Sequence, residues 1–146
     1  MENRIIRLLF CIMFLVNSCS AVKTVVLDTP FVSVVKLIDA EQSLHFDVAE
    51  QYMDVIQVYT RLGSENPYED WENEMRLRDN LGKDNKFTNN FGYAHYDIEE
   101  TINGNTARVA FNNQEENPSI KSIIYGLERR NKEWIVVSIE YIMESD

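Results

Sequence analysis

A period of two in apolar and polar positions marks the C-terminal part of the chain as β-structure. Residues 120–129 and 133–142 place β-branched or aromatic side chains at alternate positions, which is typical of strands with one buried face. The polar residues Arg130, Asn131 and Lys132 separate the two runs, and Asn tolerates the positive φ that a tight turn requires. We therefore predict a β-hairpin that buries one of its faces.

A second hairpin is predicted directly upstream. Residues 93–102 and 106–112 also alternate, and Asn103, Gly104 and Asn105 lie between them. An Asn-Gly pair between two alternating runs is a strong signal for a hairpin turn. We expect the four consecutive strands to form one antiparallel sheet.

Helical periodicity precedes the strands. Thr29 and Pro30 provide an N-cap and a first helical residue. Asp47 is the N-cap predicted for a second helix, and Gly63 follows its last residue at the C′ position. A third helix opens after an Asn-Pro pair. The predicted helices span 30–42, 48–62 and 67–82.

Three N-terminal helices followed by four antiparallel strands define an α+β fold. The chain has 146 residues, of which 45% are hydrophobic, so it can form one domain with a packed interior. Strand alternation assigns one set of side chains to that interior. This set comprises Tyr96, Ile98, Ala107, Val109, Phe111, Ile123, Tyr125, Ile135, Val137, Ile139 and Tyr141.

The charge of the chain argues against one class of partner. The formal net charge is −10, and no basic stripe with interleaved aromatic residues is present. An acidic surface repels phosphate backbones. We therefore do not expect nucleic-acid binding.

The N-terminus has the features of an export signal. Arg4 and Arg7 precede residues 8–16, which carry no charge. This run is shorter than the about 20 residues of a membrane-spanning helix and fits the apolar core of a signal peptide. The next residues, Val16-Asn17-Ser18-Cys19, resemble the lipobox of bacterial lipoprotein signals. The resemblance implies a signal peptide over 1–18, a lipid-modified Cys19, a tether over 19–28 and a domain over 29–146.

The cysteine count supports this interpretation. The chain has 2 cysteines, and Cys11 would leave with the signal peptide. Cys19 would then have no disulfide partner in the exported chain, and lipidation explains its presence. The alternative is ordinary cleavage after Ala21. The expected partner is the membrane, through Cys19. Because Ser20 follows the cysteine, resemblance to envelope sorting rules implies the outer membrane of a Gram-negative cell.

Three segments resemble the cone-shaped fold of the nuclear transport factor 2-like superfamily. Residues 44–52 resemble the turn between its first two helices, 107–111 resemble its second strand, and 132–136 resemble the lead-in to its last strand. The resemblance implies helices packed on a curved four-stranded sheet. The combination of this fold with a lipobox is similar to small secreted bacterial families of unknown function. This superfamily includes enzymes, ligand binders and scaffolds, so function must be argued from the site.

The predicted interior offers little for acid–base chemistry. Enzymes of the superfamily use a buried Asp or His base, whereas alternation places His95 and Asp97 on the outer face and His45 in an exposed turn. Neither histidine has metal-ligand spacing, so we predict no catalytic residue, metal or cofactor. The candidate pocket residues are four tyrosines, each with an apolar body and a polar tip. The alternative is that these tyrosines only pack in the core. They are Tyr52, Tyr96, Tyr125 and Tyr141.

The sequence therefore leaves two candidate functions. The first is a non-catalytic, membrane-anchored module that binds an apolar small molecule or an envelope protein. The second is a small isomerase, cyclase or hydrolase that uses a pocket inside the cone. A filled interior would favour the first, and an ionisable side chain deep in an open cone would favour the second.

Overall fold

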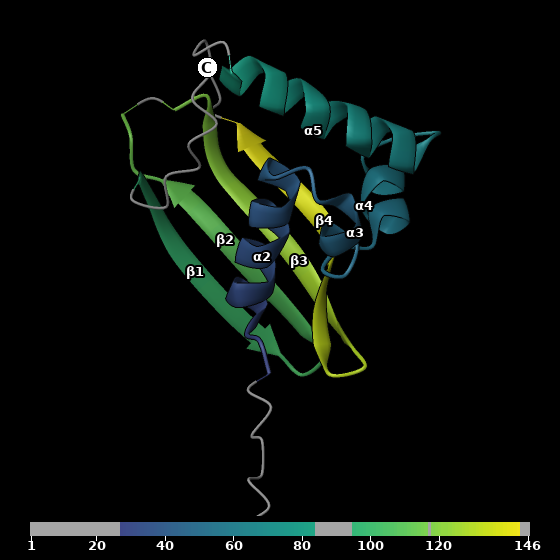
Figure 1. Ribbon diagram of the computed structural model, residues 1–146. Helices are drawn as coiled ribbons and strands as arrows, with labels where there is room; N and C mark the ends of the chain where they lie inside the picture. Colours follow the sequence, from purple (N-terminus) through teal and green to yellow (C-terminus); the bar gives the residue numbers. More distant parts are fainter. Residues whose placement is uncertain (1–26, 84–94, 117, 144–146) are drawn as a thin grey trace, which may run out of the picture.

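The computed structural model describes residues 27–83, 95–116 and 118–143 (Figure 1). The predicted signal peptide, Cys19 and most of the predicted tether lie outside these residues, as does the predicted start of the first strand at Tyr93. The described elements are four helices followed by four strands, which confirms the α+β fold. The helices are α2 (Pro30–Gln42), α3 (Phe46–Ala49), α4 (Val55–Arg61) and α5 (Pro67–Lys83). The strands are β1 (Tyr96–Asn103), β2 (Thr106–Asn113), β3 (Ile120–Arg130) and β4 (Glu133–Met143).

Helix α2 begins and ends where the sequence predicts. The Thr29 side chain accepts a hydrogen bond from the Val32 backbone N–H at 3.2 Å, and Pro30 occupies the first turn. This cap satisfies one of the N–H groups that a helix start leaves without an intrahelical partner. Val34 and Leu37 on the inner face are fully buried against the sheet.

The single helix predicted over 48–62 is instead two short helices, α3 and α4. Between them the backbone pairs with strand β4. The Val136 N–H donates to the Tyr52 carbonyl at 2.8 Å, and the Asp54 N–H donates to the Val136 carbonyl at 2.9 Å. Asp54 then caps α4 by accepting from the Gln57 N–H at 3.0 Å. The prediction was wrong because tertiary pairing with an edge strand overrides a helical period here.

The strands form one sheet in the order β1-β2-β3-β4, and each pairs antiparallel with the next. Both hairpin turns use positive φ. Gly104 has φ 61°, and Asn131 and Lys132 have φ 50° and 75°. Residues with positive φ match the twist of the flanking strands, which is why such turns join hairpins. The sheet order and both turn positions agree with the sequence prediction.

A register shift in the last hairpin changes which residues of β4 face the core. Tyr125 pairs with Ile139, but Leu127 pairs with Val136, so β4 carries one extra residue between them. The Ser138 hydroxyl occupies the space that a Cβ on Gly126 would need. The alternation therefore reverses along β4, as expected of a β-bulge.

The bulge corrects part of the predicted interior. Trp134 and Val136 lie in the core cluster, whereas Ile135 is half-buried and Val137 is buried outside that cluster. Ile139 and Tyr141, which follow the bulge, pack against the core as predicted. The assignments of Ala107, Val109, Phe111, Ile123 and Tyr125 are confirmed by their burial.

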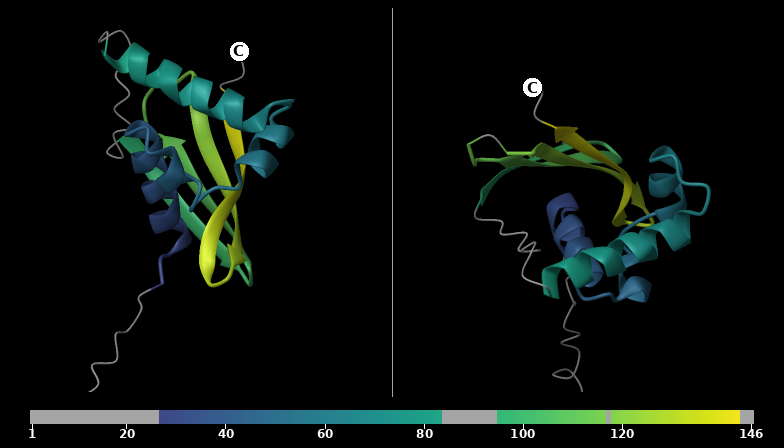
Figure 2. Two further views of the ribbon diagram at one scale, coloured as in Figure 1. Left: turned by 45° about the vertical axis from the view of Figure 1, so that its right-hand side comes forward. Right: turned by 90° about the horizontal axis from the view of Figure 1, so that it is seen from above.

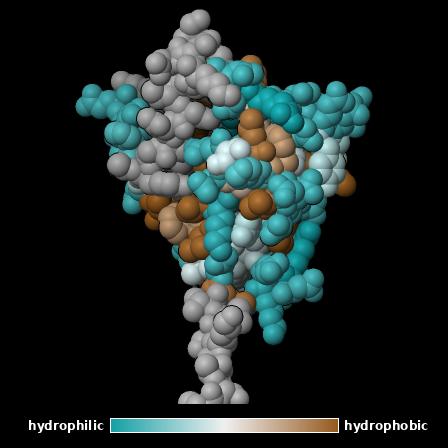
Figure 3. Space-filling model, in the orientation of Figure 1, coloured by the Kyte–Doolittle hydropathy of each residue, from teal (hydrophilic) through white to brown (hydrophobic). Residues whose placement is uncertain are grey.

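The sheet curves around α2, and α5 crosses one end of it (Figures 1 and 2). We call this the α5 end. The opposite end, here the tether end, holds the start of α2 and both hairpin turns. In the face that carries α2, apolar patches lie beside that helix among polar side chains (Figure 3). The largest fully buried side chains include Leu37, Trp71, Val109, Phe111, Leu127 and Val136.

The bulge predicts an unusual order of stability losses. Val136→Ala should lower the free energy of unfolding by about 2–3 kcal/mol, because it removes a fully buried side chain. Ile135→Ala removes one more carbon but should cost less, because Ile135 lies outside the core cluster. Urea denaturation of both variants measures the difference. A larger loss for Ile135→Ala would restore the simple alternation.

Candidate functional site

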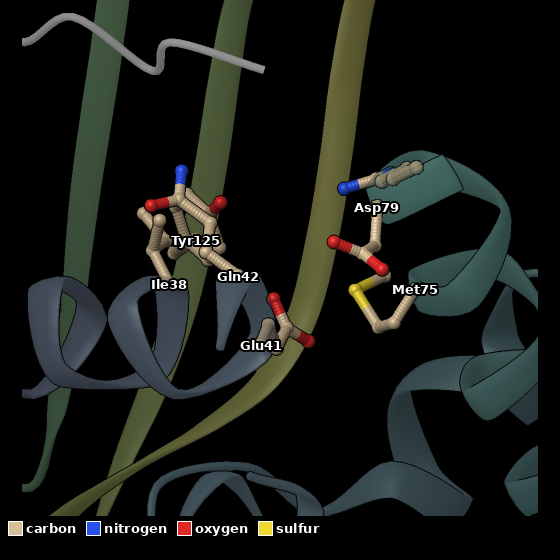
Figure 4. Close-up of a pocket in the computed structure, with 7 residues that line it drawn as sticks. Ile38, Glu41, Gln42, Met75, Asp79 and Tyr125 are labelled. Atoms are coloured by element: carbon tan, nitrogen blue, oxygen red, sulfur yellow. The ribbon is translucent and has the colours of Figure 1, made fainter. Parts of the chain in front are cut away.

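A small cavity lies at the α5 end, between α2, α5 and β3. Its volume is about 50 Å³, and Ile38, Glu41, Met75, Arg78 and Tyr125 are among the residues that line it. Figure 4 shows Glu41 on the α2 side, Met75 and Asp79 on the α5 side, and Tyr125 beside Ile38 and Gln42. This volume can hold a few water molecules but falls far short of the roughly 300 Å³ of a typical small-molecule pocket.

Glu41 is the distinctive group of this cavity. Its Oε1 accepts a hydrogen bond from the Trp71 indole N–H at 2.8 Å, which joins the end of α2 to α5. Burial is the main reason that the pKa of Glu41 rises from 4.5 to about 7, although Trp71 and Arg78 favour the ionised form. Nearby Glu74 raises the pKa further. Glu41 can therefore gain or lose a proton near neutral pH.

A second set of polar contacts ties α5 to its neighbours. The Tyr59 hydroxyl donates to Glu74 Oε2 at 2.8 Å. The Arg78 guanidinium donates to the other Glu74 oxygen and, at 3.3 Å, to the Tyr141 hydroxyl. Burial, with the charge of Glu74, raises the pKa of Tyr59. These contacts connect α4, α5 and β4, so they position the helix that closes the cavity.

The four predicted pocket tyrosines do not share one pocket. Tyr125 lines the α5-end cavity, and Tyr141 reaches its edge through Arg78. Tyr96 packs on Phe111 with ring centroids 6.3 Å apart, and Phe111 packs on Tyr125 at 5.7 Å. Tyr52 lies at a different cavity.

That second cavity, the tether-side cleft, has a volume of about 400 Å³. It lies where α2 begins, between this helix, the segment after α3 and the start of β4. Tyr52 reaches it because the backbone pairing with Val136 holds the segment beside the sheet. Six of its lining residues are Leu27, Ser33, Lys36, Tyr52, Lys132 and Trp134. Its size lies in the range of small-molecule sites.

The structure brings no metal ligands together within its described ranges. His45 and His95 are both exposed. Across 27–83, 95–116 and 118–143, no three His, Cys, Asp or Glu side chains gather to hold a metal ion. In the same ranges, no helix has the length and hydropathy to cross a membrane. Cys19, the predicted lipidation site, lies outside the described residues.

Sequence reasoning did not single out Glu41 or the cleft. Glu41 is next to Gln42 at the end of a helix, a position typical of a solvated residue. Its burial depends on Trp71, which is 30 positions away in sequence. Only the pairing of helices in space, which no local pattern encodes, could have identified it.

Comparison with known proteins gives no match to a family model, to a curated protein or to a solved structure.

The raised pKa of Glu41 predicts a pH-dependent stability. The folded state holds this proton more tightly than the unfolded state, so the stabilisation is complete below about pH 4.5 and is lost as pH rises through about 7. Glu41→Gln removes this dependence and keeps an acceptor for Trp71. Between pH 5 and pH 8, the free energy of unfolding of Glu41→Gln, relative to that of the wild type, should rise by on the order of 1–2 kcal/mol. The full effect of ~1.4 kcal/mol per pKa unit is reduced because Glu41 is partly exposed. Urea denaturation measures the difference.

The matched control is Glu69→Gln, on the exposed first turn of α5. Its stability difference from the wild type should stay nearly constant over the same pH range. Parallel curves for the wild type and Glu41→Gln would show that Glu41 has an ordinary pKa in the folded protein.

Proposed function

We propose that the chain is an exported lipoprotein, anchored in the outer membrane through Cys19, whose domain is a non-catalytic binding module. The observation that carries the binding role is the contrast between the two cavities. The interior at the α5 end is filled by packed side chains and leaves about 50 Å³, whereas the tether-side cleft offers about 400 Å³. Of these two cavities, the tether-side cleft is large enough for a ligand of ordinary size and the α5-end cavity is not.

The shape of the domain is compatible with the nuclear transport factor 2-like class. Helices come first, and an antiparallel sheet curves around α2 (Figure 2). We propose on this basis that the domain belongs to that class. The three sequence segments that resemble it also support this proposal. An apolar or amphiphilic small molecule, or an envelope protein that covers the cleft, is the proposed ligand.

The position of the cleft supports a role at the membrane. Leu27, the first described residue, lines it, and Cys19 lies eight positions earlier in the sequence. Eight extended residues span at most about 30 Å. A lipidated Cys19 would hold the cleft within that distance of the bilayer.

A second candidate function is a small isomerase or cyclase. Glu41 favours it, because a carboxyl group with a pKa of about 7 is suited to move protons at neutral pH. Such an enzyme requires the α5-end cavity to enlarge around a substrate. Double-bond isomerisation of an unsaturated cyclic ketone, followed by ultraviolet absorbance, tests this candidate. Turnover that Glu41→Gln abolishes would support it, and absence of turnover by the wild type would count against it.

The anchor is tested by replacing the cysteine. Cys19→Ala should release the protein from the membrane fraction, because each buried acyl CH₂ contributes about 0.8 kcal/mol and several chains are lost together. Cell fractionation and immunoblotting measure the distribution. Cys11→Ala is the matched control, since Cys11 would leave with the signal peptide, and this variant should stay in the membrane. Unchanged membrane retention of Cys19→Ala would contradict lipid anchoring at this residue.

A further inference from the structure

The tether-side cleft carries charges of both signs. Lys36 and Lys132 line it together with Asp28 and Glu133. The Lys36 ammonium lies 2.5 Å from Asp28 Oδ2, and Lys132 and Glu133 are neighbours at the end of the last hairpin turn. In a chain whose net charge is −10, this cleft is balanced. It can contact a ligand that carries one positive and one negative group.

The cleft also has an aromatic wall and a buried hydroxyl. The Lys36 ammonium lies 5.7 Å from the centre of the Tyr52 ring. Trp134 is 5% exposed and Ser33 is 2% exposed, so both lie in the floor. Tyr and Trp combine an apolar body with a polar tip, which suits the boundary between lipid and water.

These two properties occur in a cleft that the proposed anchor would hold near a membrane. We propose that the tether-side cleft binds the zwitterionic head group of a phospholipid, of the phosphoethanolamine class, in the membrane that carries the anchor. This inference rests on the proposed function. Lys36 and Lys132 contact the phosphate, and Asp28 and Glu133 contact the ammonium group.

The ammonium group sets the expected specificity. A primary ammonium can donate hydrogen bonds to carboxylates, and such charge-assisted bonds are stronger than neutral ones. The trimethylated ammonium of a choline head group has no N–H to donate. The cleft should therefore prefer phosphoethanolamine to phosphocholine.

The experiment uses the mature full chain in a phospholipid-free, non-ionic detergent, with glycerophosphoethanolamine as the soluble probe. The chain has 2 tryptophans, so its indole N–H signals in a nitrogen–proton NMR spectrum are simple to follow. The Trp134 signal, in the cleft, should shift and saturate with the probe. The Trp71 signal, at the α5 end, should stay in place and report that the fold is intact.

Three comparisons decide the outcome. Lys36→Gln and Lys132→Gln should each weaken binding about tenfold, the effect of losing one charge-assisted hydrogen bond. Lys121→Gln, an equal charge change on an exposed residue of β3, should not alter binding. Glycerophosphocholine and inorganic phosphate should bind more weakly than the probe.

The inference is overturned if the Trp134 signal does not respond, if Lys121→Gln is as damaging as the cleft variants, or if phosphate or glycerophosphocholine binds equally well. These results would leave the anchor itself intact, because fractionation of Cys19→Ala tests it separately. If the Cys19→Ala variant remains in the membrane fraction, the proposed function is contradicted by that separate measurement.

Discussion

Two backbone hydrogen bonds between the helical layer and the edge strand fix the arrangement of the domain. They join Val136 in β4 to Tyr52 and Asp54, at 2.8 Å and 2.9 Å. Because β4 is at the edge of the sheet, its outward N–H and C=O groups need partners other than a strand. The pairing divides one helical run into α3 and α4, satisfies the edge at Val136, and places Tyr52 in the cleft beside Trp134.

Local sequence signals predicted the helices and strands well where their formation depends on residues close in sequence. Caps, turns and strand alternation gave α2, both hairpins and the antiparallel order, because each depends on residues close in sequence. The exceptions are both non-local. Residues 135–137 are all β-branched and apolar, so alternation alone could not detect the bulge that turns Val136 to the core. The break between α3 and α4 arises from a contact with β4, more than 80 residues further along the chain.

The sites were less predictable than the elements. Chemistry alone selected the tyrosines as pocket residues, and the fold distributes them between two cavities. Glu41 acquires its raised pKa from burial between α2 and α5, a property of the packed structure that its sequence neighbours do not indicate. The balanced charge of the tether-side cleft likewise appears only when the start of α2 and the last hairpin turn come together. Residue type could suggest chemistry here, but packing decides where it acts.

Amide hydrogen exchange at Val136 tests most directly whether the helical layer is joined to the sheet in this way. The Val136 N–H points away from β3 and donates to the Tyr52 carbonyl, so it should exchange as slowly as the Tyr125 amide of the inner strand β3. The exposed Lys132 amide in the turn provides the fast reference. Exchange of Val136 at the rate of Lys132 would show that the edge of β4 is open, and the account of the cleft would then be wrong.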